Sequence, residues 1–450
     1  MTSELTPPAS PVPETGRVAA LLKRHRRRAG FTQEELAEAA GISVRSLRDV
    51  ERGRTHPRPS TLRKIASSLS LSDDEKSALF LEQLDPAANG LQESLGPARG
   101  VVPMDGVYLP PETTEFVGRE QELAGISKEL QDFRPGERNV IALVGMPGIG
   151  KTALALRWAR ANADRFPDGT YFIDAFLAWF TDGHARGFPS DNGAAPYSRA
   201  VIEVISRTLN LDLPVCADWP SGALLTAMRE ELQQKRMLVI LNNVPSAAHV
   251  RSLLPGLSST TLLLTSRRTM DSLVATHGAR QIVVPPLTDD QSAELVDKVS
   301  EGAVSNPDLT RRVLDACDGH PFALRIAAVT MRQYPELMAS SDIGRLIMRD
   351  VLDDRYFSLR GLFQQVYGGL PQPAVGLLLA LARQGREEFT VADIAESVGI
   401  PTASAAHQLS ILCSHSLIHR SRRGVYTWHR VVRHFMSTVA VPDASGDPYG

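Results

Sequence analysis

Residues 140–152 read VIALVGMPGIGKT, an apolar run followed by a loop of the form G-x-x-x-x-G-K-T. The apolar run predicts a buried strand, and the letters after the loop, ALALRWARA, predict a helix. Between a strand and a helix, such a loop cradles phosphate, because its backbone N–H groups curl around phosphate oxygens at the helix N-terminus. The sequence therefore predicts a phosphate-binding loop (P-loop). A purely structural loop is the alternative.

Two side chains of this loop have specific expected roles. The Lys151 ammonium is expected to reach the β- and γ-phosphates of a nucleotide, and the Thr152 hydroxyl to ligate Mg²⁺. The nucleotide-binding residues predicted in and beside the loop are Gly145, Pro147, Gly148, Ile149, Gly150, Lys151, Thr152 and Ala153. A nucleotide is thus the first expected ligand.

Around the loop, short β-branched runs alternate with helical patterns, which is typical of a parallel α/β layer. The candidate strands are residues 140–144, 170–173, 237–241, 261–265 and 281–284. Beyond them the pattern is helical, with a short strand pair expected around HRSRRGVYTWH, residues 419–429. That strand pair, following two helices, predicts a winged helix. The expected fold is multidomain.

A P-loop usually works with an acid that ends a neighbouring strand and holds Mg²⁺. The best candidate strand, MLVIL, ends instead in Asn242 and Asn243. An amide is neutral, binds the Mg²⁺ shell less well than a carboxylate and cannot act as a general base. We therefore expect nucleotide binding with weak or absent hydrolysis, with Asn242 as a degenerate metal ligand. The alternative is that another acid, such as Asp174 at the end of the preceding strand, takes its place.

A second pattern lies near the N-terminus, where residues 32–53 read TQEELAEAAGISVRSLRDVERG. Thr32 and Glu35 have the spacing of a capping box, which starts a helix. Gly41 can supply a left-handed turn, and Ser43 can cap the next helix. Two short helices joined by such a turn predict a helix-turn-helix.

The second of these helices has a polar outer face. With Leu47 and Val50 facing inward, the expected DNA-contacting residues are Ser43, Val44, Arg45, Ser46 and Arg48. Arginine is the side chain that pairs bidentately with guanine in the major groove. Phosphate contacts are expected from Lys23, Arg24, Arg26, Arg27, Arg28, Arg52, Arg54 and Arg58.

Charge supports this interpretation. Residues 17–65 contain 13 lysines and arginines against five acidic residues, although the whole chain has a net charge of −2. A basic end on an otherwise acidic protein indicates a polyanion partner for that end, and double-stranded DNA is the first candidate. The alternative is a solvated basic bundle that contacts protein.

The overall composition, 43% hydrophobic and 22% charged, is that of a globular protein. No uninterrupted apolar run is long enough to span a membrane, so no membrane partner is expected. The three cysteines lie far apart, which excludes a close-spaced zinc cluster and favours the cytoplasm. The expected parts are a disordered tail (1–14), a helix-turn-helix domain (15–83), a linker (84–115), a P-loop domain (116–286), a helical subdomain (287–350), a winged-helix subdomain (351–440) and a tail (441–450).

At these residues the basic domain resembles the XRE, or lambda-repressor-like, helix-turn-helix family. That resemblance implies a DNA contact from Gln33, at the start of the first helix of the pair. From residue 116 onward the chain resembles the NB-ARC branch of the STAND nucleotide-switch ATPases. The motifs that carry this resemblance are FVGREQEL, GMPGIGKT, VILNNV, TLLLTSRR, CDGHPFALRIAA and YTWHRVVRHFM.

The resemblance to NB-ARC proteins implies further nucleotide contacts. They come from Val117, Gly118 and Arg119 in the opening motif, from Arg267 as the phosphate-sensing arginine, from Pro321 against the base, and from His429 at the β-phosphate of ADP. Within these motifs the chain departs from the family at two positions, Asn242 and Arg430, the second of which stands where the family has an Asp. The change at Asn242 concerns the Mg²⁺ site. The change at Arg430 concerns the contact that holds the closed state together in the family.

The resemblance also implies a two-state switch, closed with ADP and open or oligomeric with ATP, that controls transcription. Bringing several copies together as a homo-oligomer would raise DNA affinity through effective concentration. Two other functions remain as alternatives: a slow ATPase, and a signalling or defence scaffold whose basic domain contacts protein.

Overall fold

The computed structural model describes residues 16–52, 65, 68, 69, 107–113, 115–131, 139–175, 194–209, 211, 221–257, 260–302, 306–349 and 358–440. The chain divides into two compact units. The first comprises residues 1–98 with 183–187, and the second comprises residues 99–182 with 188–450. The tails expected at residues 1–14 and 441–450, and most of the expected linker, lie outside the described residues.

The first unit contains helices α1 (Gly16–Arg28), α2 (Gln33–Ala39) and α3 (Val44–Glu51). Thr32 and Glu35 form the predicted capping box at the start of α2. Ser43 caps α3 by accepting a hydrogen bond from the backbone N–H of Ser46. Gly41, between the two helices, has a φ angle of 59°. The buried apolar core of this unit is formed by Leu22, Leu36, Ala37, Ala40, Leu47, Val50, Ile65 and Leu69. The local sequence signals for a helix-turn-helix are therefore confirmed.

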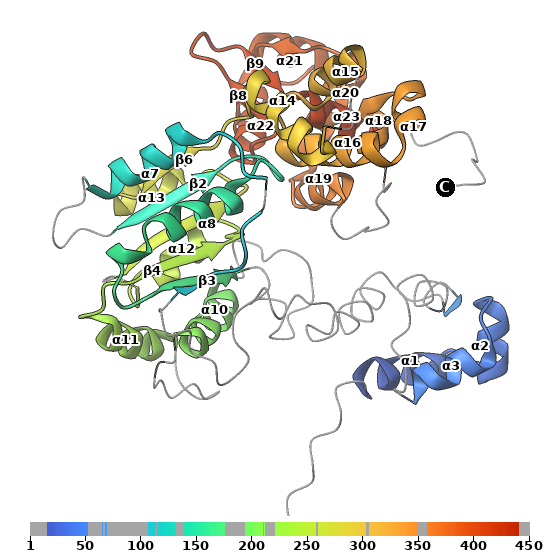
Figure 1. The fold of residues 1–450 in the computed structure, drawn as a ribbon, viewed down its shortest axis with the longest axis horizontal. Helices are drawn as coiled ribbons and strands as arrows, with labels where there is room; N and C mark the ends of the chain where they lie inside the picture. Colours follow the sequence, from blue (N-terminus) through green and yellow to red (C-terminus); the bar gives the residue numbers. More distant parts are fainter. Residues whose placement is uncertain are drawn as a thin grey trace, which may run out of the picture. The chain divides into compact units, whose positions relative to one another are not determined.

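The second unit is built on a six-stranded sheet (Figure 1). Its strands are β1 (Val107–Tyr108), β2 (Val140–Val144), β3 (Thr170–Asp174), β4 (Leu238–Asn242), β5 (Thr261–Ser266) and β6 (Arg280–Val283). They lie in the order β1-β3-β4-β5-β2-β6, and every neighbouring pair is parallel. The predicted parallel α/β layer is thus confirmed, with the P-loop strand β2 between β5 and β6.

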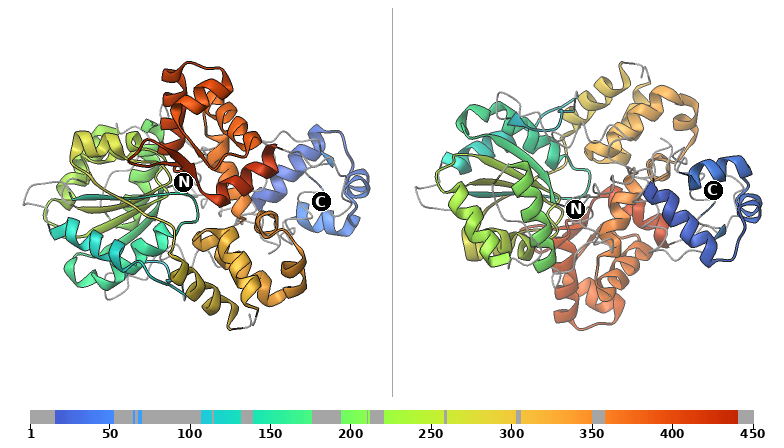
Figure 2. Two further views of the ribbon diagram at one scale, coloured as in Figure 1. Left: turned by 90° about the horizontal axis from the view of Figure 1, so that it is seen from above. Right: turned by 90° about the horizontal axis from the view of Figure 1, so that it is seen from below.

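Helices cover both faces of this sheet, as the left view of Figure 2 shows. One face packs against α7 (Glu120–Gln131) and α8 (Lys151–Ala161). The other packs against α10 (Ala194–Thr208), α11 (Ser221–Leu232), α12 (Ala247–Leu253) and α13 (Asp271–His277). A 3-10 turn, η1 (Ala163–Arg165), follows α8. Because both faces are covered, the central strands are continuous apolar runs without polar alternation.

The C-terminal part of the second unit is mainly helical. Its elements are α14 (Asp289–Ser300), α15 (Pro307–Cys317), α16 (Pro321–Gln333), α17 (Pro335–Ser340), α18 (Ile343–Ile347), α19 (Leu359–Gly368), α20 (Gln372–Gln384), β7 (Glu388–Phe389), α21 (Val391–Val398), α22 (Thr402–Ser414), β8 (Ile418–Arg420), β9 (Tyr426–Trp428) and α23 (Arg430–Ala440). Strands β8 and β9 form the predicted pair, and β7 adds a third strand beside β9. Residues of α14–α18 and of α19–α23 share one hydrophobic core cluster.

Strands β3 to β6 each differ from the predicted ranges by one residue at one end or both, and one further strand was not predicted. Strand β1 lies inside the stretch expected to be linker, residues 84–115, and pairs with β3. A two-residue strand carries too little periodicity to be seen in the sequence. Strand β4 extends one residue further than expected and includes Asn242 in its ladder with β3. Asn242 is therefore the last residue of the strand and is paired with Asp174 of β3.

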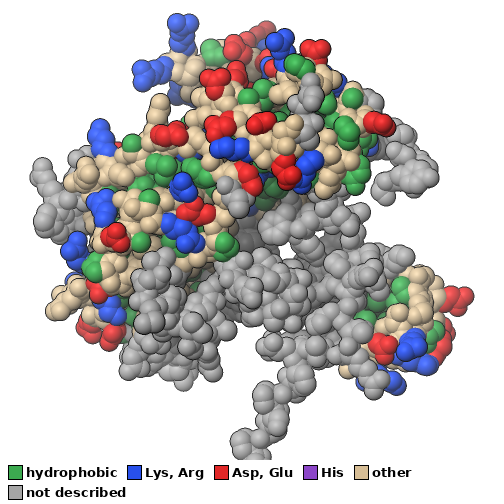
Figure 3. All heavy atoms as spheres, viewed as in Figure 1, with side chains coloured by type: hydrophobic (Ala, Val, Ile, Leu, Met, Phe, Trp, Pro, Cys, Tyr) green, Lys and Arg blue, Asp and Glu red, His purple; other side chains and the backbone are tan. Residues whose placement is uncertain are grey.

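Figure 3 shows basic and acidic side chains interspersed over the face drawn there. The large apolar side chains that are exposed among the described residues are Val274, Val283, Tyr334 and Leu337. Among the described helices, none is long and apolar enough to cross a membrane.

Candidate nucleotide site and DNA-binding helix

The P-loop backbone needs its glycines. Gly145, Gly148 and Gly150 have φ angles of 155°, 73° and 97°, which side-chain-bearing residues rarely adopt. At Gly148 a Cβ atom would also lie 2.7 Å from Cε1 of His320. The loop therefore has the conformation that turns backbone N–H groups toward a phosphate. At Gly148, in the middle of the loop, its backbone packs closely against the ring of His320.

Lys151 begins α8 and is buried. Its Nζ donates to the backbone oxygens of Gly145 (2.8 Å) and Met146 (2.9 Å). Burial, reinforced by the positive charge of Arg267, lowers the pKa of Lys151 to about 7. The lysine is thus held within the loop, close to a second cation, in a setting that favours a bound anion.

Behind the loop, Thr152 faces the end of β4. Its Oγ1 donates to Oδ1 of Asn242 at 2.7 Å, and Oγ1 of Thr265 donates to the same oxygen at 2.7 Å. Asn242 is buried. The amide predicted to replace the usual acid therefore does lie beside the P-loop threonine, and it presents an oxygen to that threonine.

An acid lies one strand further along the sheet. Asp174 ends β3 in register with Asn242. Its Oδ2 accepts hydrogen bonds from Nδ2 of Asn242 and from Nδ2 of Asn243, each at 2.8 Å. The backbone N–H of Asn243 donates to Oγ1 of Thr265 at 3.0 Å. Both asparagines thus converge on one carboxylate oxygen.

The opening motif lies against the P-loop. Val117 is buried, and Gly118 has a φ angle of 63° where a Cβ would meet the Gln291 side chain. Arg119 is buried, and its guanidinium donates to the backbone oxygens of Pro285 (2.6 Å) and Ile149 (3.1 Å). The arginine expected to face the nucleotide thus binds carbonyls of the chain itself. A direct role in nucleotide binding stays a prediction.

His320 connects the helical subdomain to the P-loop. Its Nε2 lies 2.7 Å from the Pro147 backbone oxygen, and its Nδ1 accepts from the backbone N–H of Ala323 at 3.2 Å. With one nitrogen accepting and the other donating to a carbonyl, the ring is neutral and protonated on Nε2. Pro321, the residue predicted to face the base, follows as the first residue of α16 and is half-buried.

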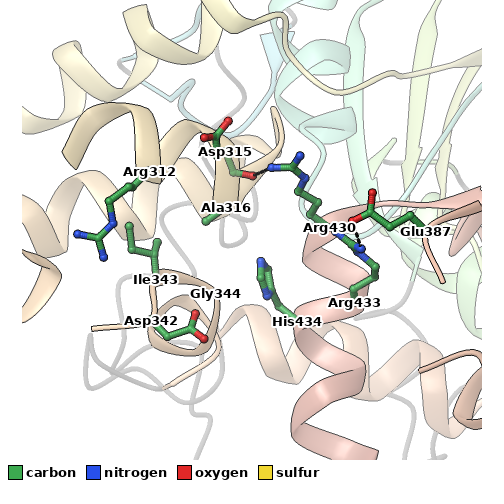
Figure 4. A pocket seen from close by; sticks show the side chains of 10 residues that line it. All are labelled: Arg312, Asp315, Ala316, Asp342, Ile343, Gly344, Glu387, Arg430, Arg433 and His434. Atoms are coloured by element: carbon green, nitrogen blue, oxygen red, sulfur yellow. Dashed lines mark hydrogen bonds and ion pairs between the residues drawn. The ribbon is translucent and has the colours of Figure 1, made fainter. Parts of the chain in front are cut away.

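His429 occupies a corresponding position at the start of α23. Its Nε2 lies 2.7 Å from the Asp318 backbone oxygen, and its ring is 5.9 Å from the ring of His320. The structure therefore brings His429 next to the histidine that covers the P-loop, while its own hydrogen bond goes to Asp318. Arg430 donates to the Asp315 backbone oxygen at 2.9 Å, as Figure 4 shows. The residue that replaces the family's Asp thus ties α23 to α15.

A pocket opens beside this contact, between α15, α18 and α23 (Figure 4). Arg433 of α23 is paired with Glu387 at its rim. The ring of His434, which also lines the pocket, lies so close to Gly344 of α18 that a Cβ on that glycine would fall 2.1 Å from Cε1 of the ring. The two helices thus meet where only glycine leaves room.

Arg267 contacts C-terminal elements that pack beyond the sheet. Its Nη1 donates to Oε1 of Gln365 in α19 at 2.9 Å. Its backbone oxygen accepts from the Ser416 hydroxyl at 3.2 Å, and Thr269 donates its N–H to the Ser414 oxygen at 2.9 Å. Burial lowers the pKa of Arg267, opposed by the charge of Asp174. The arginine predicted to sense phosphate thus also touches the C-terminal subdomain.

The donor set around the loop fits a nucleotide phosphate. Lys151 and the glycine-shaped backbone supply the cation and the N–H groups. For Mg²⁺, the Thr152 hydroxyl and the Asn242 amide offer the oxygen atoms that this ion prefers, but both are neutral. Among the described residues, no group of three or more His, Cys, Asp or Glu side chains could hold a metal by itself. When bound, Mg²⁺ would neutralise phosphate charge, with Thr152 and Asn242 beside it.

In the first unit, the outer face of α3 is only partly as predicted. Arg45 and Ser46 are exposed. Val44 is instead half-buried and packs against the core of this unit, so its assignment to the outer face is wrong. Arg48 is exposed, but it is paired with Glu34 and donates to Oε1 of Gln33. Arg45 is thus the side chain of α3 that reaches outward without a hydrogen bond or ion pair to another described residue.

Arg26, one of the predicted phosphate contacts, is bound within the first unit. Its Nε lies 2.6 Å from Oε1 of Glu51, with side-chain exposures of 11% and 2%, and its Nη1 donates to the Phe31 backbone oxygen. Gln33 donates to the same carboxylate at 2.6 Å. This buried network joins all three helices. Arg54 and Arg58 lie outside the described residues.

Comparison with known families agrees with this geometry. Residues 22–76 match the helix-turn-helix family, and residues 115–324 match the AAA ATPase domain family. The chain joins a helix-turn-helix domain to an AAA ATPase domain. The ATPase-domain match extends past the expected boundary at residue 286 and includes His320 and Pro321.

The chain is also similar to proteins that are named as regulators. It is 26% identical over 353 residues to the regulatory protein AfsR of Streptomyces griseus, covering 77% of this chain and 34% of that protein. It is 27% identical over 446 residues to AfsR of Streptomyces coelicolor, covering 96% of this chain and 41% of that protein. The chain thus spans about two fifths or less of the length of these relatives.

Two further similarities are more distant. The disease resistance-like protein DSC1 of Arabidopsis thaliana is 27% identical over 270 residues, 56% of this chain and 20% of that protein. Among solved structures, the Walker-type ATPase of Pyrococcus abyssi is 14% identical with a TM-score of 0.50, covering 73% of this chain and 99% of that chain. The structural likeness concerns the fold alone.

Sequence reasoning missed two residues of the candidate sites, His320 and Glu51. His320 stands before a proline that begins a helix, which is a signal that could have indicated an N-cap. Its contact with the P-loop is 173 residues distant in sequence, so no local pattern indicates it. Glu51 follows Leu47 by four residues and so lies on the inward face of α3. A charged side chain on the buried face of a helix indicates that an oppositely charged or hydrogen-bonding partner lies beside it.

Proposed function

We propose that this chain is a DNA-binding regulator of the STAND type, in which a nucleotide bound at the P-loop controls the activity of the helix-turn-helix domain. The proposal combines a basic N-terminal helix-turn-helix, a P-loop with its lysine and threonine in place, and similarity to proteins named as regulatory. The nucleotide is ADP or ATP, and the protein acts in the cytoplasm.

The contact between Arg267 and Gln365 carries this proposal. Arg267 follows β5 close enough to the P-loop for its charge to act on Lys151, and it also donates to α19 of the winged-helix subdomain. A phosphate that attracts this guanidinium competes with Gln365 for it. Because a ligand shifts an equilibrium only through its different affinity for two states, such competition gives ADP and ATP different effects.

The second support is the pair of histidines at the subdomain boundary. His320 binds the P-loop carbonyl of Pro147, and His429 binds Asp318 of the helical subdomain. Any rearrangement of the loop therefore reaches the N-terminus of α16 and, through the neighbouring ring, the start of α23. We propose that ADP favours this closed arrangement and that ATP favours an open form that assembles into a homo-oligomer, raising DNA affinity through effective concentration.

Slow or absent hydrolysis is part of this function. Asn242 takes the place of the acid and is neutral, so it cannot accept a proton from water. A switch that turns over slowly holds each nucleotide state for a long time. The chain would then report which nucleotide it holds, with little consumption of ATP.

A signalling scaffold is the second candidate. It is favoured by the similarity to a disease resistance-like protein and by the engagement of Arg48 with Glu34, which leaves fewer arginines of α3 turned outward. In that case the basic domain would contact protein, and its retention on DNA would not depend on α3.

The first test identifies the nucleotide. The purified protein is denatured and any released nucleotide is identified by chromatography, with Lys151→Ala in parallel. We expect near-stoichiometric ADP or ATP from the wild type and none from the variant, because the lysine supplies the cation inside the loop. Release of nothing, together with no calorimetric binding of ADP or ATP, would overturn the proposal.

The second test addresses DNA. Retention on a pool of duplexes of random sequence is measured across a salt series for the wild type, Arg45→Ala and Arg48→Ala. Loss of a base-reading arginine should cost about 1–3 kcal/mol of discrimination between sites. We expect the larger loss for Arg45→Ala, because Arg48 is partly engaged by Glu34. Unchanged retention in both variants would favour the scaffold.

A further inference from the structure

The carboxyl ends of β3 and β4 carry an acid and two amides in an unusual order. Asp174 ends β3, in register with Asn242 on β4, and Asn243 follows directly. Oδ2 of Asp174 accepts from Nδ2 of both asparagines at 2.8 Å. A carboxylate oxygen only accepts hydrogen bonds, so each asparagine must turn its NH₂ group toward Asp174.

This arrangement fixes the orientation of the Asn242 amide. With its nitrogen on Asp174, its Oδ1 faces the hydroxyls of Thr152 and Thr265, each at 2.7 Å. The Thr152 hydroxyl donates its proton to that oxygen, which leaves its lone pairs for a metal. Asn242 therefore presents an oxygen to Thr152 as an acid at this position would. The negative charge is instead on Asp174, which accepts a hydrogen bond from the Asn242 amide.

One negative charge and two neutral amides fit together at this site, because the amides donate to the carboxylate. An acid at position 242 or 243 would place a second negative charge at hydrogen-bonding distance from Asp174, where like charges oppose ionisation. The charge of Asp174 also acts on Arg267, which in turn lies near Lys151. Asp174 thus faces the same cationic site that the usual acid would face, from the adjacent strand.

We propose that Asp174 is the acid of the Mg²⁺-nucleotide site: a positioning residue on β3 that acts through the Asn242 amide on the P-loop threonine. This inference rests on the proposed binding of nucleotide at the P-loop. The negative charge of the metal site is then moved from position 242 to Asp174 and is not lost. Mg²⁺ should therefore still strengthen nucleotide binding, and this effect should require the Asp174 carboxylate.

A purely structural role would have a different signature. If Asp174 only tied the ends of β3 and β4 together, its removal would weaken binding of free ATP and of Mg²⁺-ATP alike. If it supplies the charge of the metal site, its removal weakens the metal-bound complex selectively. Binding of metal-free ATP would then be unchanged or tighter, because a negative charge near the phosphates is gone.

The experiment compares three variants with the wild type. They are Asp174→Asn, the exchange variant Asp174→Asn/Asn242→Asp, and the control Asp168→Asn, which makes the same charge change before the opposite end of β3 and retains an acceptor for the Arg236 N–H. ATP binding is measured calorimetrically with and without Mg²⁺. Mn²⁺ affinity of the ATP complex is measured by electron paramagnetic resonance.

We expect Asp174→Asn to bind Mn²⁺ on the ATP complex about 10-fold or more weakly, the scale found when outer partners of metal ligands are lost. The exchange variant moves the carboxylate next to Thr152 and should restore or exceed wild-type Mn²⁺ affinity. Asp168→Asn should match the wild type.

Three outcomes overturn the inference. Equal Mn²⁺ affinity in wild type and Asp174→Asn would show that the carboxylate does not serve the metal. Parallel losses with and without metal that the exchange does not rescue would show a structural role. Absence of ATP binding in the wild type itself, with or without Mg²⁺, would overturn the proposed function and this inference with it.

Discussion

His320 and His429 use their ring nitrogens in the same way. Each accepts at Nδ1 from a backbone N–H at the start of its own helix, and each lies with Nε2 2.7 Å from a backbone oxygen of another element. Both rings are therefore neutral when these four hydrogen bonds are made. A proton on Nδ1 would remove the helix cap, so acid weakens the contact of α16 with the P-loop.

This predicts a specific pH dependence for His320. Burial, with a further contribution from His429, lowers the pKa of His320 to about 3, below the ordinary 6.5. Between these values the unfolded chain binds a proton that the folded chain does not, so stability falls as pH drops from about 6.5. In His320→Gln the slope of unfolding free energy against pH should be shallower by up to about 1.4 kcal/mol per pH unit.

Urea unfolding at several pH values between 5 and 8 measures these slopes. His407→Gln is the matched control, since that histidine is exposed on α22. The interpretation fails if His320→Gln retains the full wild-type slope, or if His407→Gln reduces it equally.

At the scale of elements, the contact between α18 and α23 depends on one missing side chain. Gly344 is buried, and a Cβ there would lie 2.1 Å from Cε1 and 2.2 Å from Nδ1 of His434. The ring itself must move to admit a methyl group, because several of its atoms are within reach. Overfilling of this kind typically costs 1–3 kcal/mol.

Gly344→Ala should therefore destabilise the second unit by about 1–3 kcal/mol. Hydrogen exchange in peptides from α18 and α23 should accelerate first. The control is Gly376→Ala, because that glycine lies within α20 with open space around its Cβ position, where alanine is favoured in a helix. A Gly344→Ala protein as stable as the wild type, with unchanged exchange, would contradict the steric account.

What the sequence could predict follows from how local each signal is. The strand and loop of residues 140–152 and the capping box at Thr32 depend on neighbours within a few positions, and both are confirmed. Arg26 and Arg119 were assigned to ligands from their type and motif alone. In the structure they bind Glu51 and the carbonyl of Pro285, which lie 25 and 166 residues away. Sequence patterns over a few neighbouring residues cannot predict contacts between positions so far apart in the chain.

The same limit applies to the second acid of the nucleotide site. The sequence showed that Asn242 replaces an acid and offered Asp174 as an alternative. The register of β3 against β4 brings those two side chains together, and register is a property of the assembled sheet. Their roles at the metal stay predictions.

At the scale of the whole molecule, polar contacts join the sheet to the C-terminal elements of the second unit, which include α19 and α22. Arg267 donates to Gln365, Ser416 donates to the Arg267 carbonyl, and Thr269 donates to Ser414. If nucleotide state is transmitted through Arg267, loss of its partner on α19 should uncouple the two sites. Coupling free energies between sites are commonly 1–3 kcal/mol.

Gln365→Ala should therefore reduce the difference in DNA retention between the ADP-loaded and ATP-loaded protein toward zero, while nucleotide still binds. Gln372→Ala, an exposed glutamine at the start of α20, serves as the control. Retention is compared in ADP and in ATP at one salt concentration. A Gln365→Ala protein with the full wild-type difference would show that the signal takes another route.

The shared core of the C-terminal elements determines how the chain can be divided for study. Apolar residues of α16 and α18 belong to the same buried cluster as residues of α19 and α23. An expression fragment ended near residue 350 would keep the P-loop but uncover that cluster, and exposed apolar surface of this kind promotes aggregation. The smallest fragment suited to crystallisation or calorimetry should therefore begin before β1 and continue through α23.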